Sequence, residues 1–187
     1  MPQTVRLFIA VKIKIHPRLR NVLSRLKMMG RVVKPVSADN LHLTLNFLDD
    51  VEAILTPQIT DAARTAVGDL AAFEMQLVGL GAFPHVRRPS IIWVGTADAQ
   101  TLVEIADSLS RLLRPLGFEP ERRKFHPHVT LARVRSKPPD SLAMMLTEEQ
   151  STDFGTVSLS AVHLFQSELH ADGPRYKVLS TVELAGT

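Results

Sequence analysis

The chain of 187 residues contains no cysteine. This absence excludes disulfide bonds, thiolate nucleophiles, iron–sulfur clusters and cysteine zinc sites, so any metal would have to be held by histidine and carboxylate side chains. Aromatic residues make up only 5% of the chain, which is too little for an extended surface on which nucleic-acid bases stack. The side chains that remain for catalysis or ligand binding are histidines, hydroxyls and charged groups.

Long apolar runs and a strong net charge are also missing. The apolar run at residues 7–11 is far shorter than the roughly 18 residues of a membrane span, and it is too short for the core of a signal peptide. We therefore expect no membrane insertion and a cytoplasmic location. The 22 Lys and Arg against 19 Asp and Glu give a net charge of +3, which favours an anionic partner only weakly.

What the sequence does contain is an alternation of strand-like and helix-like segments. With 45% hydrophobic residues a chain of this length can bury a core, and we expect one domain spanning residues 1–187. Period-two apolar patterns indicate strands, and apolar residues three or four apart indicate helices. The predicted strands are 5–13, 41–48, 73–83, 90–96, 126–133, 156–169 and 175–184, and the predicted helices are 17–29, 56–73, 100–116 and 141–150.

One four-residue pattern occurs twice. "HLTL" at residues 42–45 returns as "HVTL" at residues 128–131, an offset of 128 − 42 = 86. The strand before each motif recurs at about the same offset, and so does the order of strand, helix, motif strand and helix. Such self-similarity indicates a duplicated unit, so we expect two pseudo-symmetric lobes that face each other, with "PHVRRPS" at residues 84–90 as the crossing point between them.

Each motif predicts the same arrangement of polar groups. Residues i and i+2 of a strand project to one face about 6.5 to 7 Å apart, so His42 shares a face with Thr44, and His128 with Thr130. If the lobes are related by a twofold axis, the four side chains converge on one point. Hydroxyls there could hold phosphate oxygens, and two imidazoles with a pKa of about 6.5 could act as acid and base on opposite sides of the phosphorus. Neither a metal nor a covalent nucleophile is required.

At these residues the chain resembles the two-histidine (2H) phosphoesterase superfamily, which is defined by two His-x-Thr-x motifs. "LHLTLNFL", "LVGLGAFP", "IIWVG", "FHPHVTLAR" and "LFQSELHADGPRYKVL" are similar to blocks of its RNA 2',3'-cyclic phosphodiesterases, historically called 2'-5' RNA ligases. The resemblance covers nearly the whole chain. One departure is visible: the family commonly has Phe-Leu-Gly after the first motif, whereas Asp49 and Asp50 follow Phe47 and Leu48 here, so the turn after that strand is expected to differ.

The resemblance implies a bilobal α+β fold with two antiparallel sheets that flank a central cleft and helices on the outside. It implies hydrolysis of an RNA terminal 2',3'-cyclic phosphate to a 2'-phosphomonoester without a cofactor or metal, and reversible 2'-5' ligation to a 5'-hydroxyl. His42 would be the proton donor and His128 the proton acceptor, with Thr44 and Thr130 binding the phosphate. The pseudo-symmetry leaves the two histidine roles interchangeable on the sequence alone. The expected partners are RNA ends with a 2',3'-cyclic phosphate, including tRNA fragments; the protein is expected to be a monomer without an obligatory protein partner.

Arg133 matches an arginine that contacts phosphate in this family. Strict alternation puts Arg133 on the face opposite His128, so this role requires a bulge in the strand near Ala132. The alternative is an exposed arginine that covers the sheet edge.

Several other interpretations stay open. The substrate could be a small cyclic nucleotide, a cyclic ADP-ribose phosphate or a 2'-5' oligonucleotide, or the protein could bind RNA ends without turnover; a metal-dependent phosphodiesterase is least favoured. "HPH" raises the option of metal ligation by His126, although a structural role is the expectation. Trp93 is expected in the core. Four other aromatic residues could stack on one terminal base: Phe47, Phe83, Phe165 and Tyr176.

Overall fold

The side chains of the first strand alternate between the two faces of the sheet that carries the site. In the computed structural model, which describes residues 4–121, 124–170 and 173–186, β1 (Thr4–Lys12) is an alternating strand. Its odd-numbered apolar residues from Leu7 to Val11 belong to the main core, which lies under the helices. Phe8 and Ala10 point the other way and form a separate small cluster with Phe165. This second face is the one that carries the polar motifs.

The described residues form nine strands and four α-helices. The strands after β1 are β2 (Val33–Pro35), β3 (His42–Glu52), β4 (Phe73–Phe83), β5 (Ile91–Thr96), β6 (His128–Val134), β7 (Asp153–Leu159), β8 (Ala161–His170) and β9 (Gly173–Glu183). The helices are α1 (Pro17–Met28), α2 (Thr56–Val67), α3 (Gln100–Leu113) and α4 (Asp140–Glu148). Short 3-10 helices occupy Gly30–Val32, Ala38–Asn40, Ala53–Leu55 and Arg114–Leu116.

All nine strands belong to one curled sheet with the order β7-β4-β5-β6-β3-β1-β8-β9, and β2 is added on β6. We call β1, β3, β8 and β9 the β1 half, and β2, β4, β5, β6 and β7 the β5 half. Every pairing between these strands is antiparallel, but β3 and β6 meet at a single residue pair, Leu43 with Val129. The two antiparallel sheets that were expected are therefore two halves of one sheet, and they are joined at this pair.

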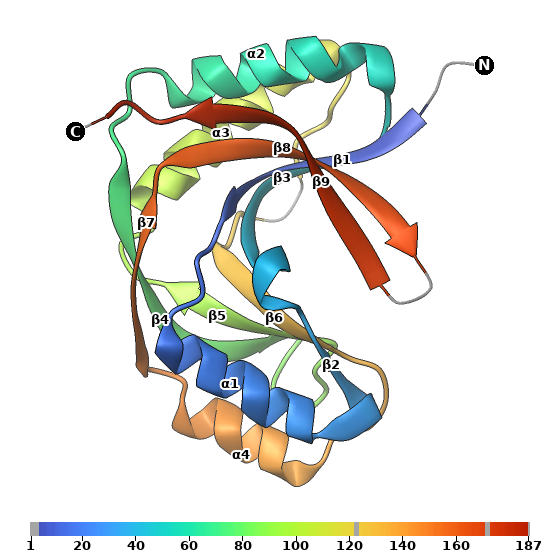
Figure 1. Ribbon diagram of the computed structural model, residues 1–187, viewed down its shortest axis with the longest axis vertical. Coiled ribbons are helices and arrows are strands. Elements are labelled where there is room, and N and C mark those ends of the chain that lie inside the picture. Colours follow the sequence, from blue (N-terminus) through green and yellow to red (C-terminus); the bar gives the residue numbers. More distant parts are fainter. Residues whose placement is uncertain (1–3, 122–123, 171–172, 187) are drawn as a thin grey trace.

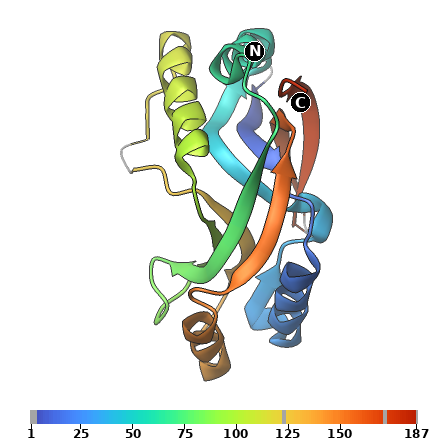
Figure 2. The ribbon, with the colours of Figure 1, turned by 90° about the vertical axis from the view of Figure 1, so that its left-hand side faces the viewer.

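The helices cover the outer faces of both halves, as expected for the α+β fold (Figure 1). Helices α2 and α3 pack on the β1 half, and α1 and α4 pack on the β5 half. Seen from the side, the helices lie at the two ends of the molecule with the strands between them (Figure 2). The faces that carry the two histidine motifs are left without a helix, and we call them the open face. No described helix is both long and apolar enough to cross a lipid bilayer.

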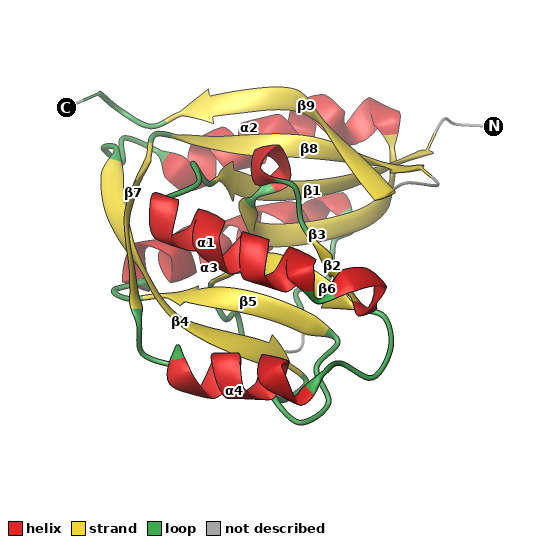
Figure 3. Cartoon of the chain, turned by 60° about the horizontal axis from the view of Figure 1, so that its bottom comes forward, coloured by secondary structure: helices red, strands yellow, loops and turns green. Residues whose placement is uncertain are grey.

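The chain crosses between the halves more often than the sequence suggested. Residues 84–90 were expected to be the crossing point, but they join β4 and β5, which pair within one half, so this prediction is wrong. Helix α1 follows β1 and packs on the β5 half, whereas α3 follows β5 and packs on the β1 half. Each half is therefore completed by segments from distant parts of the sequence. Figure 3 shows β7 in the half of β4 and β8 in the half of β1, although only Ser160 separates these two strands along the chain. A single domain of two pseudo-symmetric lobes stays a prediction.

Segment 156–169, predicted as one strand, is two strands with different partners. Leu159 ends β7 opposite Phe73 of β4, and Ala161 begins β8 opposite Glu183 of β9. The apolar alternation continues through Ser160, so periodicity alone gives no sign of the change of partner. Helix α2 also ends earlier than predicted, at Val67, because Gly68 adopts a φ of 55°.

Candidate active site

Strands β3 and β6 bring the two motifs side by side at the centre of the sheet. Because the strands are antiparallel and Leu43 pairs with Val129, the register places His42 on the side of Thr130 and Thr44 on the side of His128. The side chains of this apolar pair point into the core, and all four polar side chains lie on the open face, half-buried. The convergence predicted from the repeated pattern is thus present in the structure.

Both histidines are held by the same backbone hydrogen bond. The His42 Nδ1 lies 2.7 Å from the carbonyl oxygen of Asn40, and the His128 Nδ1 lies 2.6 Å from that of His126. A carbonyl oxygen can only accept, so in each ring Nδ1 carries the proton and donates it. Nε2 is left in both rings as the nitrogen that gains or loses a proton.

Both imidazoles favour the neutral form. Burial lowers the pKa of His42, the hydrogen bond to Asn40 opposes this, and the charges of Arg133 and His128 lower it further. Burial likewise lowers the pKa of His128; its hydrogen bond to the His126 carbonyl opposes the shift, and the charge of the His126 ring adds to it. A neutral Nε2 is a proton acceptor, and an anionic ligand would supply the charge that makes one of the two a donor.

The aromatic surroundings of the two histidines differ. The His42 ring centroid lies 5.0 Å from that of Phe8 and 5.1 Å from that of Tyr176, and Phe165 packs parallel to Phe8. The His128 ring meets Phe83 edge-on at 5.0 Å. Sequence reasoning named Phe165, Tyr176 and Phe83 as stacking candidates but missed Phe8, whose place opposite Phe47 across the strand pair is visible only once the register is known.

The threonine hydroxyls are available to a ligand. Within residues 4–121, 124–170 and 173–186, neither Thr44 nor Thr130 forms a side-chain hydrogen bond to the protein. A half-buried hydroxyl without a protein partner can donate to a phosphate oxygen at no cost in existing bonds.

Arg133 lies on the open face because β6 has the bulge that this position requires. Ile92 pairs with Ala132 and Trp93 with Thr130, so Leu131 is an extra residue on β6. Leu131 and Ala132 are consecutive and both fully buried, and Arg133 then returns to the side of His128. Its charge reaches His42 and Tyr176, since it acts on the pKa of both. The structure confirms the predicted bulge next to Ala132.

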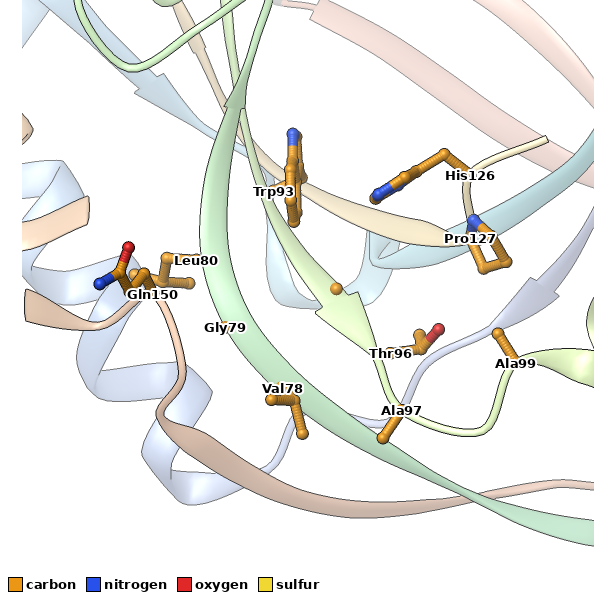
Figure 4. A pocket seen from close by; sticks show the side chains of 11 residues that line it. Val78, Gly79, Leu80, Trp93, Thr96, Ala97, Ala99, His126, Pro127 and Gln150 are labelled. Carbon is orange, nitrogen blue, oxygen red and sulfur yellow. The ribbon is translucent and has the colours of Figure 1, made fainter. Parts of the chain in front are cut away.

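A pocket of about 290 Å³ is lined by Trp93 on β5 and by His126 and Pro127, the two residues that precede β6 (Figure 4). The indole of Trp93 lies over Gly81, where any Cβ would collide with the ring. Trp93 was expected in the core; instead it is half-buried on the open face opposite Thr130, because the glycine across the strand makes room for it there. The Trp93 Nε1 and the Oγ1 of Thr96, another residue of the pocket lining, are buried without a hydrogen-bond partner among the described residues.

His126 serves His128 through its backbone carbonyl, while its ring packs 5.1 Å from Trp93. This is the structural role expected for it. The described part of the chain holds no group of three His, Asp or Glu side chains placed to bind a metal ion.

Comparison with known proteins gives a consistent result. Residues 16–171 match the model of the 2'-5' RNA ligase superfamily. A protein of Aeropyrum pernix named RNA 2',3'-cyclic phosphodiesterase is 37% identical over 172 residues, which cover 91% of this chain and 97% of the relative. A protein of Methanothermobacter thermautotrophicus with the same name is 32% identical, with 96% and 99% covered.

Solved structures agree with this result over the whole fold. The protein TT0787 of Thermus thermophilus superposes with a TM-score of 0.79 at 28% identity, covering 97% of this chain and 98% of the other. E. coli LigT complexed with 3'-AMP superposes with a TM-score of 0.71 at 25% identity, covering 97% and 99%. The chain therefore belongs to the 2'-5' RNA ligase superfamily of two-histidine phosphoesterases.

Proposed function

We propose that the protein hydrolyses the terminal 2',3'-cyclic phosphate of RNA to a 2'-phosphomonoester by general acid–base catalysis with His42 and His128, and without a metal. The observation that carries this proposal is the matched pair of Nδ1 hydrogen bonds, which leaves Nε2 of both rings to exchange protons on one face of the sheet. The names of the two relatives described above support the substrate class.

The reaction needs one proton acceptor and one proton donor. The His128 Nε2 takes a proton from water as the water oxygen bonds to phosphorus, and the bond from phosphorus to the ribose 3'-oxygen breaks. The His42 Nε2 gives its proton to that 3'-oxygen, so the product carries a 2'-phosphate and a 3'-hydroxyl. After the reaction His128 has gained a proton and His42 has lost one, so the two rings have exchanged their protonation states.

Thr44, Thr130 and Arg133 would hold the two non-bridging oxygens. The hydroxyls supply neutral donors, and the guanidinium supplies the charge that stabilises the transition state, in which negative charge accumulates on these oxygens. The positive charge of Arg133 next to His42 also favours release of the His42 proton to the leaving oxygen.

The same site could run the reaction with another nucleophile. A 5'-hydroxyl of a second RNA in the place of water would give a 2'-5' linkage, which is the ligation that the superfamily name describes. A small cyclic nucleotide or a 2'-5' oligonucleotide would present the same phosphorus chemistry to the same residues. The remaining alternative is a protein that binds RNA ends without turnover. Binding alone would not require two Nε2 atoms that can exchange protons.

The test is incubation of the purified protein, in EDTA, with an RNA oligonucleotide that ends in a 2',3'-cyclic phosphate. We expect a 2'-phosphate, identified by its sensitivity to phosphatase and its resistance to a nuclease that requires a 3'-phosphate. His42→Ala and His128→Ala should each lower turnover by about 10² to 10⁴, while His85→Ala, an exposed histidine in the β4–β5 loop, should not change it.

The result can contradict the proposal in separate ways. A 3'-phosphate would reverse the direction of the departing oxygen, and activity restored only by added zinc or manganese would replace the mechanism. Tight binding without product would favour the RNA-end-binding alternative. The cytoplasmic location, the monomeric state and the tRNA fragments among the substrates stay predictions.

A further inference from the structure

A row of side chains crosses the open face of the β1 half and leads away from His42. Lys12 pairs directly with His42 across the β1–β3 ladder, so both side chains lie on the same face. One step along β1, Ala10 pairs with Thr44 on one side and with His163 of β8 on the other. The open face thus continues from the histidine motif of β3 to Lys12 and His163.

The ring of Phe165 forms the floor between these groups. The Lys12 Nζ lies 5.8 Å from the centroid of this ring, and the ring centroids of His163 and His42 lie 5.6 Å and 6.2 Å from it. Lys12 is exposed, and in the part of the chain that the structure describes no carboxylate forms an ion pair with it. An ammonium group that packs on an aromatic ring beside the cleft, with no acidic partner, is free to bind an anion.

His163 adds hydrogen-bonding capacity to the same place. Its Nδ1 lies 3.1 Å from Oγ1 of Thr181, the residue that it faces on β9. Burial lowers the pKa of His163, the charge of Lys12 lowers it further and the carboxylate of Glu183 raises it. When the Thr181 hydroxyl donates to Nδ1, the neutral ring carries its proton on Nε2 and offers it as a donor.

We propose that Lys12 and His163 bind the phosphodiester that precedes the terminal cyclic phosphate of an RNA chain. This subsite rests on the proposed function, since it takes the next phosphate of the same substrate. If His42 protonates the ribose 3'-oxygen, the terminal ribose lies on the His42 side of the phosphorus, and the rest of the RNA leaves the site on that side. The four-carbon stem of Lys12 places its charge over the Phe165 ring, which packs beside His42 on that side.

The charges favour a phosphodiester over a base. A compact ammonium with nearby neutral donors matches the single negative charge of a phosphodiester, whereas a base would need a ring face or a patterned edge of donors and acceptors. Glu183, which faces Ala161 on the same side of the sheet, sets an opposing charge near His163. Its presence limits the subsite to a modest contribution and predicts that Glu183→Gln strengthens it.

The experiment compares two substrates of the intact protein: a nucleoside 2',3'-cyclic phosphate, and a dinucleotide that ends in the same cyclic phosphate. Lys12→Met keeps an unbranched stem over Phe165 and removes only the charge. It should lower kcat/KM for the dinucleotide about three- to tenfold, the range of one exposed charge-assisted contact, and leave the mononucleotide unchanged. Lys177→Met is the matched control, because Lys177 lies between Tyr176 and Val178 and points to the opposite face.

An uncharged linkage makes the test specific for the phosphate. For the wild type, kcat/KM should fall by the same factor when the phosphodiester of the dinucleotide is replaced by a methylphosphonate. Lys12→Met should not lower kcat/KM for this uncharged dinucleotide any further. Equal effects of Lys12→Met on both substrates, or no effect on either, would overturn the subsite. Binding of the two 2'-phosphate products gives the same comparison without turnover, so a protein that hydrolyses neither substrate would contradict the proposed function and still decide the subsite.

Discussion

Leu45 and Leu131 are each the extra residue of an irregularity in strand pairing, and each follows a motif histidine by three positions. Ala10 pairs with Thr44 and Ile9 with Asn46, which leaves Leu45 without a partner, just as Leu131 is skipped in the pairing of β6 with β5. The same backbone device therefore returns the next side chains to the open face in both motifs. In one motif it presents the exposed ring of Phe47, and in the other the guanidinium of Arg133.

Replacing Arg133 tests the charged side chain that the bulge of β6 places on the open face. Arg133→Gln should lower kcat/KM by roughly 10² to 10³, as for the loss of one donor to a developing negative charge. The same change removes a positive charge that lowers the pKa of His42, so that pKa should rise. If His42 is the acid, the alkaline limb of the kcat/KM profile moves to higher pH; the limb that moves in a pH series of the variant identifies the role of His42.

The profile of kcat/KM against pH for the wild type should have its maximum on the acidic side of neutral pH. Burial lowers the pKa of both histidines below the usual value of about 6.5, and kcat/KM reports the free enzyme, so its alkaline limb should begin below that pH. The bound anionic phosphate favours the protonated rings and should move the limbs of kcat to higher pH than those of kcat/KM. A kcat/KM that is flat between about pH 5 and 9 would contradict acid–base catalysis by this pair.

The threonines should matter for turnover and hardly for stability. Thr44→Val and Thr130→Val keep the branched shape and remove a hydroxyl that has no protein partner within the described residues, so the free energy of unfolding should stay nearly constant. A lost hydrogen bond to a charged phosphate should lower kcat/KM roughly ten- to a hundredfold. Thr→Ser at either position restores the donor and should recover most of the activity; urea unfolding of all four variants provides the control.

Asp49 holds a backbone conformation that suits glycine. Its φ is 53°, in the left-handed region, and its carboxylate is paired at 2.8 Å with the exposed Arg6. Asp49→Gly should raise the free energy of unfolding by up to about 1 kcal/mol, because the left-handed strain disappears and an exposed ion pair contributes little. Asp49→Val, with a branched Cβ in the same conformation, should lower it; unfolding curves of the two variants decide the sign.

Gly81 is the platform for the indole of Trp93. Gly81→Ala should force the ring away, at a cost of about 1 to 3 kcal/mol in the free energy of unfolding. Trp93 is the single tryptophan of the chain, so its fluorescence reports the displacement directly. In a Trp93→Ala background the same alanine should cost much less; equal costs in both backgrounds would show that the indole does not rest on this glycine.

Local pattern was sufficient to predict the four helices, most of the strands and the shared face of the motif residues, but it missed β2 and the break between β7 and β8. Period-two alternation placed His42 and Thr44 on one face and their leucine neighbours on the other, and β3 shows this arrangement. The offset between the motifs was enough to expect two facing units. The departure from strict alternation near Ala132 was expected only from the resemblance, because Arg133 matches a phosphate-contacting arginine of the family, and the bulge at Leu131 provides it.

What the sequence could not predict depends on partners that are distant in the chain. The Phe8, Phe165 and Tyr176 surroundings of His42 come from three strands, and no local pattern links them. Trp93 looked like a core residue because it stands in the apolar run "IIWVG". Only the pairing of Trp93 with Gly81 and Thr130 shows which face it occupies.

The pairing of β1 with β8 has a consequence for synthesis on the ribosome. Leu7 of β1 faces Gln166 of β8, so one edge of β1 has no partner until all the segments between these two strands have been translated. Until then β1 is an edge strand of the sheet, and its unpaired backbone groups are prone to pair with other chains. A nascent chain arrested before β8 should therefore need a chaperone to stay unaggregated.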